Sequence, residues 1–278
     1  MNDRNSYIRY LFEDEDGNRL LTAFINGRAK NYSNKMLKTI KNNLKAGDIN
    51  IYRRLRKIPK YSKKKGVFKD EEWSGRASNR ASELLDQIPD DLEINTIMDI
   101  GSSEGTITGE FGKLLGLSRD NIIAVDIQKP KHGHISKDIT FVMIKPGDSL
   151  PAEDESIDIV TASMSFHHID TIDQTLDEIY RVLRPGGVLI MREHDARKID
   201  PIFKIYLEVV HGLYATVLST PLEMSPEDFV NDHYSNYRSK YEWISLLREH
   251  GFRPVRKPWN SGQIKGRMRG FLMTFEKF

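Results

Sequence analysis

A small-residue turn and an acid at the end of the next apolar run are the residues of this chain best placed to bind a ligand. The apolar run Ile97–Ile100 leads into Gly101–Gly105, which reads GSSEG. A second apolar run, Ile122–Val125, ends at Asp126. This order predicts a strand, a tight turn, a helix and a second strand that closes on a carboxylate. Because such an acid can accept hydrogen bonds from both hydroxyls of a ribose, the segment predicts a nucleoside pocket at the carboxyl edge of a parallel sheet.

The spacing of the small residues limits which nucleoside ligand the turn suits. A dinucleotide site has the pattern Gly-x-Gly-x-x-Gly, so that the backbone can close on a pyrophosphate at the helix start. Here the three positions hold Gly101, Ser103 and Thr106, so only the first fits. The phosphate-binding pattern that ends in Gly-Lys-Ser/Thr is also absent from the sequence. The turn therefore favours a ligand without phosphate groups.

Further motifs follow the turn in order along the chain. They are Gly147-Asp148-Ser149-Leu150-Pro151, the segment 156–162, Phe166-His167-His168, and the segment 178–190. Over residues 95–193 the chain resembles the class I S-adenosylmethionine-dependent methyltransferases, and among them the type 11 group that includes the ubiquinone and menaquinone C-methyltransferases. The resemblance implies an α/β, Rossmann-like fold with a seven-stranded, mostly parallel sheet, helices on both faces and an antiparallel closing hairpin.

The same resemblance implies a cofactor and the residues that hold it. The cofactor would be S-adenosyl-L-methionine, and the product S-adenosyl-L-homocysteine. Asp126 would hold the ribose, and Asp148 with the backbone around Ser149 would meet the adenine edge. The chain departs from the family at one position, because glycine is usual where it has Ser103. The residues that would shape the loop beneath the methionine part of the cofactor are Asp99, Gly101, Ser103 and Gly105.

Two histidine-containing triplets are expected at the same edge of the sheet, at the mouth of the pocket. Phe166-His167-His168 leaves the fourth strand, and Glu193-His194-Asp195 leaves the fifth. Transfer of a sulfonium methyl depends mainly on alignment of the acceptor and exclusion of water. A histidine that titrates near neutral pH can add a general base when the acceptor is a hydroxyl or an acidic carbon. His194 and His168, with Glu193, are the catalytic candidates; packing, helix capping and substrate binding are the alternatives for the histidines.

The segment 196–250, between the fifth and sixth strands, is a long insertion that predicts a substrate lid. A helix with an apolar face is expected near 202–210, and a second helix begins within 237–243. No metal is expected, because the acidic pair that a metal-dependent methyltransferase would use after the fourth strand is missing. The residues expected to bind the substrate are His167, Asp195, His211, Tyr214 and Tyr237.

The rest of the chain predicts the elements around this site. Residues 1–72 are expected to form a helical, basic N-terminal extension for substrate recognition or a lid, and residues 73–278 the methyltransferase domain. The other predicted elements are helices near 36–44, 51–58 and 74–88, a turn at Pro185-Gly186-Gly187 before the fifth strand, and closing strands at 251–258 and 269–278.

Composition excludes several classes of protein. No segment reaches the unbroken apolar length of a membrane span, and no apolar signal region follows Met1, so a cytoplasmic or nuclear location is expected and secretion is not. The chain has no cysteine, which removes disulfides, thiolate zinc sites and cysteine nucleophiles.

The net charge of +2 conceals a local concentration of positive charge. Nine basic residues and no carboxylate lie between Arg53 and Lys69, with Tyr52, Tyr61 and Phe68 among them or close by. Such a segment suits either a polyanion or a solvated linker. Three functions are therefore left open: a small-molecule methyltransferase, an RNA methyltransferase acting at cap guanine N7 or a tRNA base through Arg53–Lys69, and a catalytically inactive regulatory subunit that binds S-adenosylmethionine.

Overall fold

A computed structural model describes residues 4–29, 32–48, 50–58, 70–129, 135–218, 224–255 and 270–278. The chain divides into two compact units. One, here called the helical unit, comprises Met1–Glu71 and Arg197–Tyr234; the other, the sheet unit, comprises Glu72–Ala196 and Ser235–Phe278. The insertion predicted at 196–250 is thus divided, with 197–234 in the helical unit and 235–250 in the sheet unit.

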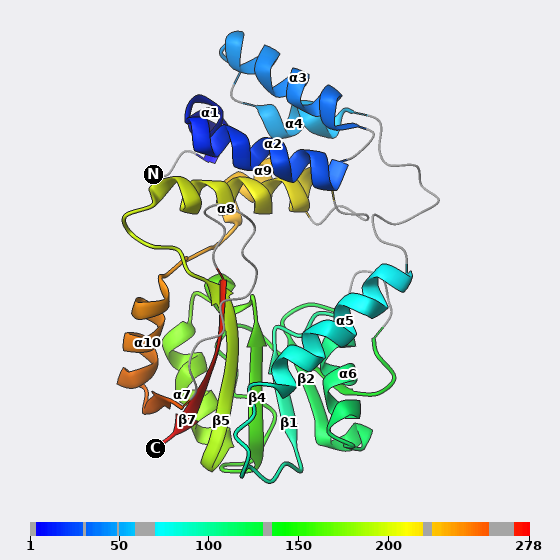
Figure 1. Ribbon diagram of the computed structural model, residues 1–278, viewed down its shortest axis with the longest axis vertical. Coiled ribbons are helices and arrows are strands. Elements are labelled where there is room, and N and C mark those ends of the chain that lie inside the picture. The colour runs from blue at the N-terminus through cyan, green and yellow to red at the C-terminus, as the bar shows by residue number, and fades with distance from the viewer. Residues whose placement is uncertain are drawn as a thin grey trace. The chain divides into compact units, whose positions relative to one another are not determined.

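The sheet unit is built on a seven-stranded sheet (Figure 1). Its strands run in the order β3-β2-β1-β4-β5-β7-β6, and β7 is antiparallel to both β5 and β6. The predicted mostly parallel sheet with an antiparallel closing hairpin is confirmed. The strands are β1 (Ile97–Ile100), β2 (Ile122–Asp126), β3 (Thr140–Met143), β4 (Ile157–Ser163), β5 (Leu183–His194), β6 (Phe252–Pro254) and β7 (Gly270–Lys277).

Helices cover both faces of this sheet. They are α5 (Asp70–Leu85), α6 (Thr106–Leu114), α7 (Ile172–Val182) and α10 (Lys240–Glu249), with short 3-10 turns η2 (Arg119–Asn121) and η3 (Phe166–His168). Phe111 of α6 and Leu84 of α5 belong to the core on one face, and Leu176 of α7 and Trp243 of α10 to the core on the other. Because both faces are covered, the central strand β4 is buried almost throughout, as in other parallel sheets.

The fifth strand begins earlier than the sequence suggests. Pro185-Gly186-Gly187 was expected as a turn before the strand, but Leu183 already pairs with Ile157, and pairing resumes at Val188 with Ile159. The intervening residues form an irregularity inside the strand. Gly187 has no room for a side chain, because a Cβ there would lie 2.9 Å from the Arg184 carbonyl oxygen. The predicted boundary is wrong because pairing with β4 takes Leu183 into the strand.

The helical unit contains the helices of the N-terminal segment and those of residues 197–234. They are α1 (Arg4–Glu13), α2 (Glu15–Ala29), α3 (Ser33–Lys45), α4 (Ile51–Arg56), α8 (Pro201–Leu213), the π-helical turn η4 (Tyr214–Leu218) and α9 (Pro226–Asp232). Helix α8 packs on α1 and α2, and the Arg4 Nε lies 2.9 Å from Glu208 Oε2. Helix α3 and α4 occupy the regions where periodicity predicts helices.

The segment Pro201–Leu218 meets the length and composition of a membrane-crossing helix, which differs from the expectation that no segment would. It is the one candidate among the described residues, and 56% of it is buried inside the structure. Its polar residues include Glu208, which is held by Arg4. These are the properties of a core helix of the helical unit.

The buried carboxylate of Asp99 joins β1 to its neighbours in the sheet unit. Its Oδ1 accepts a hydrogen bond of 2.7 Å from the Thr161 hydroxyl of β4, and its Oδ2 accepts one from the Thr108 hydroxyl of α6. Burial raises the pKa of Asp99 to about 6, and the nearby Asp126 charge adds to the rise, while the two hydroxyls oppose it. Asp99 therefore holds the start of α6 against the sheet.

The raised pKa of Asp99 predicts that the contribution of this residue to the stability of the fold falls as the pH rises. An unfolded aspartate titrates near 3.9, so between about pH 4 and 6 the folded chain keeps a proton that the unfolded chain has released. The free energy of unfolding then decreases with pH. Asp99→Asn cannot titrate at this position. We therefore expect the difference in free energy of unfolding between this variant and the native protein to change in favour of the variant by about 2 to 3 kcal/mol from pH 4 to pH 7. Urea unfolding at a series of pH values measures this; a difference independent of pH would contradict it.

Candidate functional site

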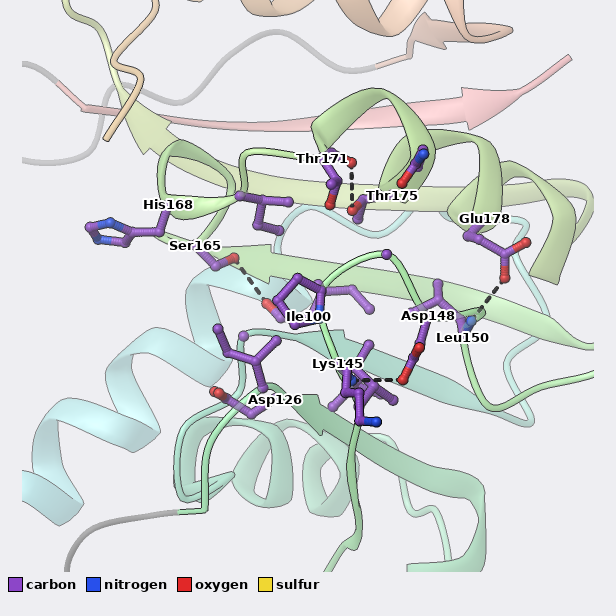
Figure 2. A pocket seen from close by; sticks show the side chains of 18 of the residues that line it. Ile100, Asp126, Lys145, Asp148, Leu150, Ser165, His168, Thr171, Thr175 and Glu178 are labelled. Atoms are coloured by element: carbon purple, nitrogen blue, oxygen red, sulfur yellow. Dashed lines mark hydrogen bonds between the residues drawn. The ribbon is translucent and has the colours of Figure 1, made fainter. Parts of the chain in front are cut away.

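A cavity of about 320 Å³ opens at the carboxyl ends of the central strands (Figure 2). This volume falls within the usual range for small-molecule sites, about 300 to 1,000 Å³. The cavity lies where the chain leaves β1 for β2 on one side and β4 lies on the other, which is the switch point of an open α/β sheet. Its walls come from Ile100 and Gly101, from Val125–Gln128, from Ile144–Asp148 and Leu150, from parts of 164–171, and from Gln174, Thr175 and Glu178 of α7.

The loop after β1 approaches its neighbours too closely for a side chain at Gly101. Its φ is +72°, and a Cβ there would lie 2.5 Å from the Ser165 Cβ. The Ser165 hydroxyl donates to the Ile100 carbonyl at 2.9 Å, which fixes the wall that faces the glycine. Gly105 also has a positive φ, +70°, and is the N-cap of α6, where a Cβ would clash with Ile139. These glycines let the loop turn tightly between the strand and the helix.

Asp126, at the end of β2, is held by two backbone amides. The Ser103 N–H donates to its Oδ2 at 2.8 Å, and the Gln128 N–H donates to its Oδ1 at 3.0 Å. Each carboxylate oxygen can accept a second hydrogen bond, so the residue remains able to receive a pair of hydroxyls. Ser103 has a φ of +53°, a backbone conformation that costs energy for any residue with a side chain.

Asp148 belongs to a pre-organised turn that also lines the cavity. The turn Lys145-Pro146-Gly147-Asp148 has its proline at the second position and a φ of +81° at Gly147, as in a type II turn. The Asp148 N–H donates to the Lys145 carbonyl at 3.0 Å, and the Lys145 N–H donates to Asp148 Oδ2 at 2.8 Å. Glu178 of α7 accepts the Leu150 N–H at 2.8 Å and so holds the chain that follows this turn.

The structure separates the predicted cofactor residues into two groups. Gly101, Asp126 and Asp148 line the cavity, and Asp126 and Asp148 appear along it in Figure 2. The others do not line it. Ser103 and Gly105 belong to the loop behind the cavity. Asp99 accepts hydrogen bonds from two threonines, and Ser149 is exposed.

The predicted histidines form a cluster at the carboxyl ends of β4 and β5. The His167 ring centroid lies 4.0 Å from that of His168 and 5.3 Å from that of His194. His167 is fully buried, and its Nδ1 lies 2.8 Å from Glu193 Oε2. Tyr237 stacks on His167 at 5.1 Å. The two predicted triplets are therefore brought together in space, as expected for neighbouring strands.

Burial distinguishes the members of this cluster chemically. It lowers the pKa of His194 to about 4 and that of His167 to about 2, and it raises the pKa of Glu193. The expectation that His194 titrates near neutral pH is therefore wrong, because the protein surroundings of its ring disfavour the charged form. Of the three predicted catalytic residues, all of them described, His168 alone lines the cavity, and it is exposed there.

The predicted substrate-binding residues occupy different places. Asp195 is buried, and its Oδ1 accepts the Lys240 N–H at 2.9 Å in the first turn of α10. Tyr237 lies in the histidine cluster. His211 and Tyr214 belong to the helical unit, where the His211 Nδ1 lies 2.8 Å from the Leu207 carbonyl oxygen and the Tyr214 ring packs edge-on against Phe24.

Several lining residues escaped the sequence analysis. Four of them lie on one face of α7 and its N-cap: Thr171, Gln174, Thr175 and Glu178. Their spacing of three and four residues could have predicted this shared face once the helix was assigned. No pattern in the sequence predicts that Met164 lines the cavity. Its φ of +57° is rare for a residue with a side chain, and it arises where its N–H pairs with the Arg192 carbonyl oxygen at the end of β4.

Comparison with known proteins agrees with this geometry. Residues 98–191 match the family model described as a methyltransferase domain. Over 119 residues the chain is 28% identical to the ubiquinone/menaquinone biosynthesis C-methyltransferase UbiE of Vibrio vulnificus. That alignment covers 40% of this chain and 45% of the relative, so the chain matches less than half the length of this curated relative.

Solved structures with low sequence identity share the fold. The YcgJ protein of Bacillus subtilis superposes with a TM-score of 0.52 at 16% identity, covering 72% of this chain and 98% of its own. A SAM-dependent methyltransferase of Methanosarcina mazei gives a TM-score of 0.51 at 17% identity, covering 70% and 97%. At these identities the likeness supports the Rossmann-like architecture alone.

The positive φ of Ser103 predicts that glycine is more stable at this position. Removal of the side chain relieves about 1 to 2 kcal/mol of left-handed strain and costs about 0.5 to 1 kcal/mol of backbone entropy. We therefore expect Ser103→Gly to raise the free energy of unfolding by up to about 1 kcal/mol. Ser102→Gly is the matched control, since the φ of Ser102 is not positive, and it should lower stability. Urea denaturation compares the two; equal losses would contradict the strain.

Proposed function

This chain carries a class I S-adenosylmethionine-dependent methyltransferase domain, and from that premise we propose that it transfers the methyl group of S-adenosyl-L-methionine to a small-molecule acceptor. The observation that carries the proposal is the Asp126 carboxylate, held by two backbone amides beside a left-handed loop at the switch point of the sheet. A carboxylate in this place suits the two ribose hydroxyls of the cofactor.

The residues of the cavity fit a nucleoside cofactor. Gly101 leaves its part of the wall open, since any side chain would meet Ser165. Ile127, Ile144 and Leu150 supply apolar surface near the polar groups of Asp126 and Asp148, a combination typical of small-molecule sites. We infer that Asp126 binds the ribose and that the 145–148 turn borders the adenine. When bound, the cofactor supplies an electrophilic methyl group on a sulfonium.

The chain's own residues have three tasks in such a reaction. The loop after β1 and the turn at 145–148 orient the nucleoside, and the surrounding apolar residues exclude water. Figure 2 shows His168 at one end of the view and Glu178 at the other, with Asp126 and Asp148 between them. We assign the acceptor to the His168 end, where the imidazole of His168 takes a proton from the acceptor during in-line displacement.

The small-molecule acceptor is favoured over RNA by the described part of the basic segment. Tyr52, an aromatic residue that a single-stranded RNA site would use for stacking on bases, is buried, and its ring packs against Phe229 at 5.5 Å. Arg53 and Arg54 lie within 3.4 and 2.7 Å of carboxylates of Glu227 and Asp48. Residues 59–69, with five of the six lysines of this segment, lie outside the described residues. The named relative above is also a small-molecule methyltransferase.

Replacement of Asp126 tests the cofactor assignment. Removal of a charged hydrogen-bond acceptor costs about 1.5 to 3 kcal/mol, so Asp126→Ala should weaken S-adenosylmethionine binding by about 10- to 100-fold. Asp120→Ala is the matched control, because Asp120 is an exposed aspartate in η2, at the opposite end of the same strand. Isothermal titration calorimetry measures both. Equal affinities for the two variants would remove Asp126 from the site.

Replacement of His168 tests the proposed base. His168→Gln should lower turnover by about 100-fold or more and leave the S-adenosylmethionine dissociation constant nearly unchanged. His250→Gln serves as control, since His250 pairs with Asp173 and Asp177 at the contact of α10 with α7.

A radiolabelled methyl-transfer assay against small-metabolite, RNA and protein extracts identifies the acceptor class. Transfer to RNA alone would overturn the acceptor class, and no transfer to any extract would favour the regulatory alternative.

A further inference from the structure

The turn that carries His168 is attached to β5 through a buried carboxylate. Glu193, 1% exposed, lies one residue before the end of β5. Its Oε1 accepts the backbone N–H of His167 at 3.3 Å, and its Oε2 lies 2.8 Å from the His167 Nδ1 and accepts the His194 N–H at 3.2 Å. One carboxylate thus holds both the backbone and the ring of His167.

His167 in turn is enclosed by side chains and held by hydrogen bonds. Its side chain is fully buried, with Tyr237 stacked on it at 5.1 Å and an interplanar angle of 29°. Its carbonyl oxygen accepts the Asn236 N–H at 2.8 Å, which attaches the segment before α10. The residue is therefore fixed by β5 through Glu193 and by residues 236 and 237.

The ring of His168 packs against the His167 imidazole in a tilted arrangement. The two ring centroids are 4.0 Å apart, and the His168 N–H donates to the Ser165 carbonyl at 3.0 Å. His168 is exposed and lines the cavity, whereas His167 faces the protein interior. A side chain at the surface of a cavity keeps a single orientation only when its neighbours are rigid.

We propose that Glu193 is a positioning residue, which holds His168 in place at the cavity through the buried imidazole of His167. The proposal rests on the function proposed above only for its effect on turnover; the placement of the His168 ring is a property of the folded chain. Glu193 itself does not line the cavity, so it acts through its neighbour.

Three variants separate positioning from a general loss of stability. Glu193→Ala removes every acceptor, whereas Glu193→Gln keeps an oxygen that can receive the His167 Nδ1–H. Asp158→Asn is the control, since Asp158 is also a buried carboxylate; it accepts the N–H groups of Asn95 and Thr96 at 2.7 and 2.8 Å and pairs with Arg184. It lies near the start of β4, away from the carboxyl edge that carries the cavity.

The first readout is the NMR spectrum of the full chain with isotope-labelled histidine. The chain has 8 histidines, and the His168 signal is assigned by its loss in His168→Gln. In the native protein, the His168 Hε1 signal should be displaced by the ring current of His167. In Glu193→Ala it should move toward the position of a solvent-exposed histidine, in Glu193→Gln it should stay near the native position, and in Asp158→Asn it should not move.

The second readout is the division of kinetic effects. Glu193→Ala should lower kcat by about 10- to 100-fold with the S-adenosylmethionine dissociation constant changed by no more than about twofold, and Glu193→Gln should recover most of the loss. An unmoved His168 signal in folded Glu193→Ala overturns the proposal. If Glu193→Ala does not fold, Glu193→Asp takes its place, because its shorter side chain draws the carboxylate away from the His167 ring; an unmoved His168 signal in folded Glu193→Asp then overturns the proposal. A moved signal in a protein whose native form transfers no methyl group upholds the positioning and refutes the proposed function.

Discussion

The hydrogen bond from the Ser103 N–H to the Asp126 carboxylate joins the two segments on which the cavity depends. One segment is the loop that leaves β1, and the other is the end of β2. Two further bonds, from the Gly101 and Ser102 N–H groups to the Val125 carbonyl, hold the same loop against the same strand. The loop can reach the strand because Gly101 and Ser103 adopt positive φ angles. Backbone strain in this loop is therefore offset by hydrogen bonds that orient the carboxylate.

Three carboxylates near the carboxyl edge of the sheet show how environment assigns different tasks to similar groups. Asp99 is buried, each of its carboxylate oxygens accepts a threonine hydroxyl, and burial raises its pKa. Glu193 is buried with His167, and its pKa is also raised. Asp126 is half-buried at the cavity wall and keeps acceptor capacity for a ligand. Of these three carboxylates, Asp126 alone is both oriented by the backbone and accessible to a ligand in the cavity.

The histidine cluster illustrates the same division. His167, His168 and His194 are adjacent in space, yet burial lowers the pKa of His167 and His194 far below neutrality, and His168 is the one of the three that meets the cavity. A buried neutral imidazole is suited to hydrogen bonding and packing, whereas an accessible imidazole can exchange a proton with a ligand. Neighbouring residues of one triplet thus differ in the chemistry open to them.

The sequence alone determined the order of strand, turn, helix and strand over residues 97–126, with the turn at Gly101–Gly105 and the acid at the end of β2, because these depend on apolar runs, on small residues and on their spacing along the chain. It could not separate His168 from His167 and His194, show that Tyr52 is buried, or place the start of β5 at Leu183. Those outcomes depend on which side of a turn faces a cavity and on which strand lies alongside, contacts between residues far apart in sequence. Tertiary packing decided them because burial, and with it the pKa and accessibility of each group, exists only once the strands and helices have come together.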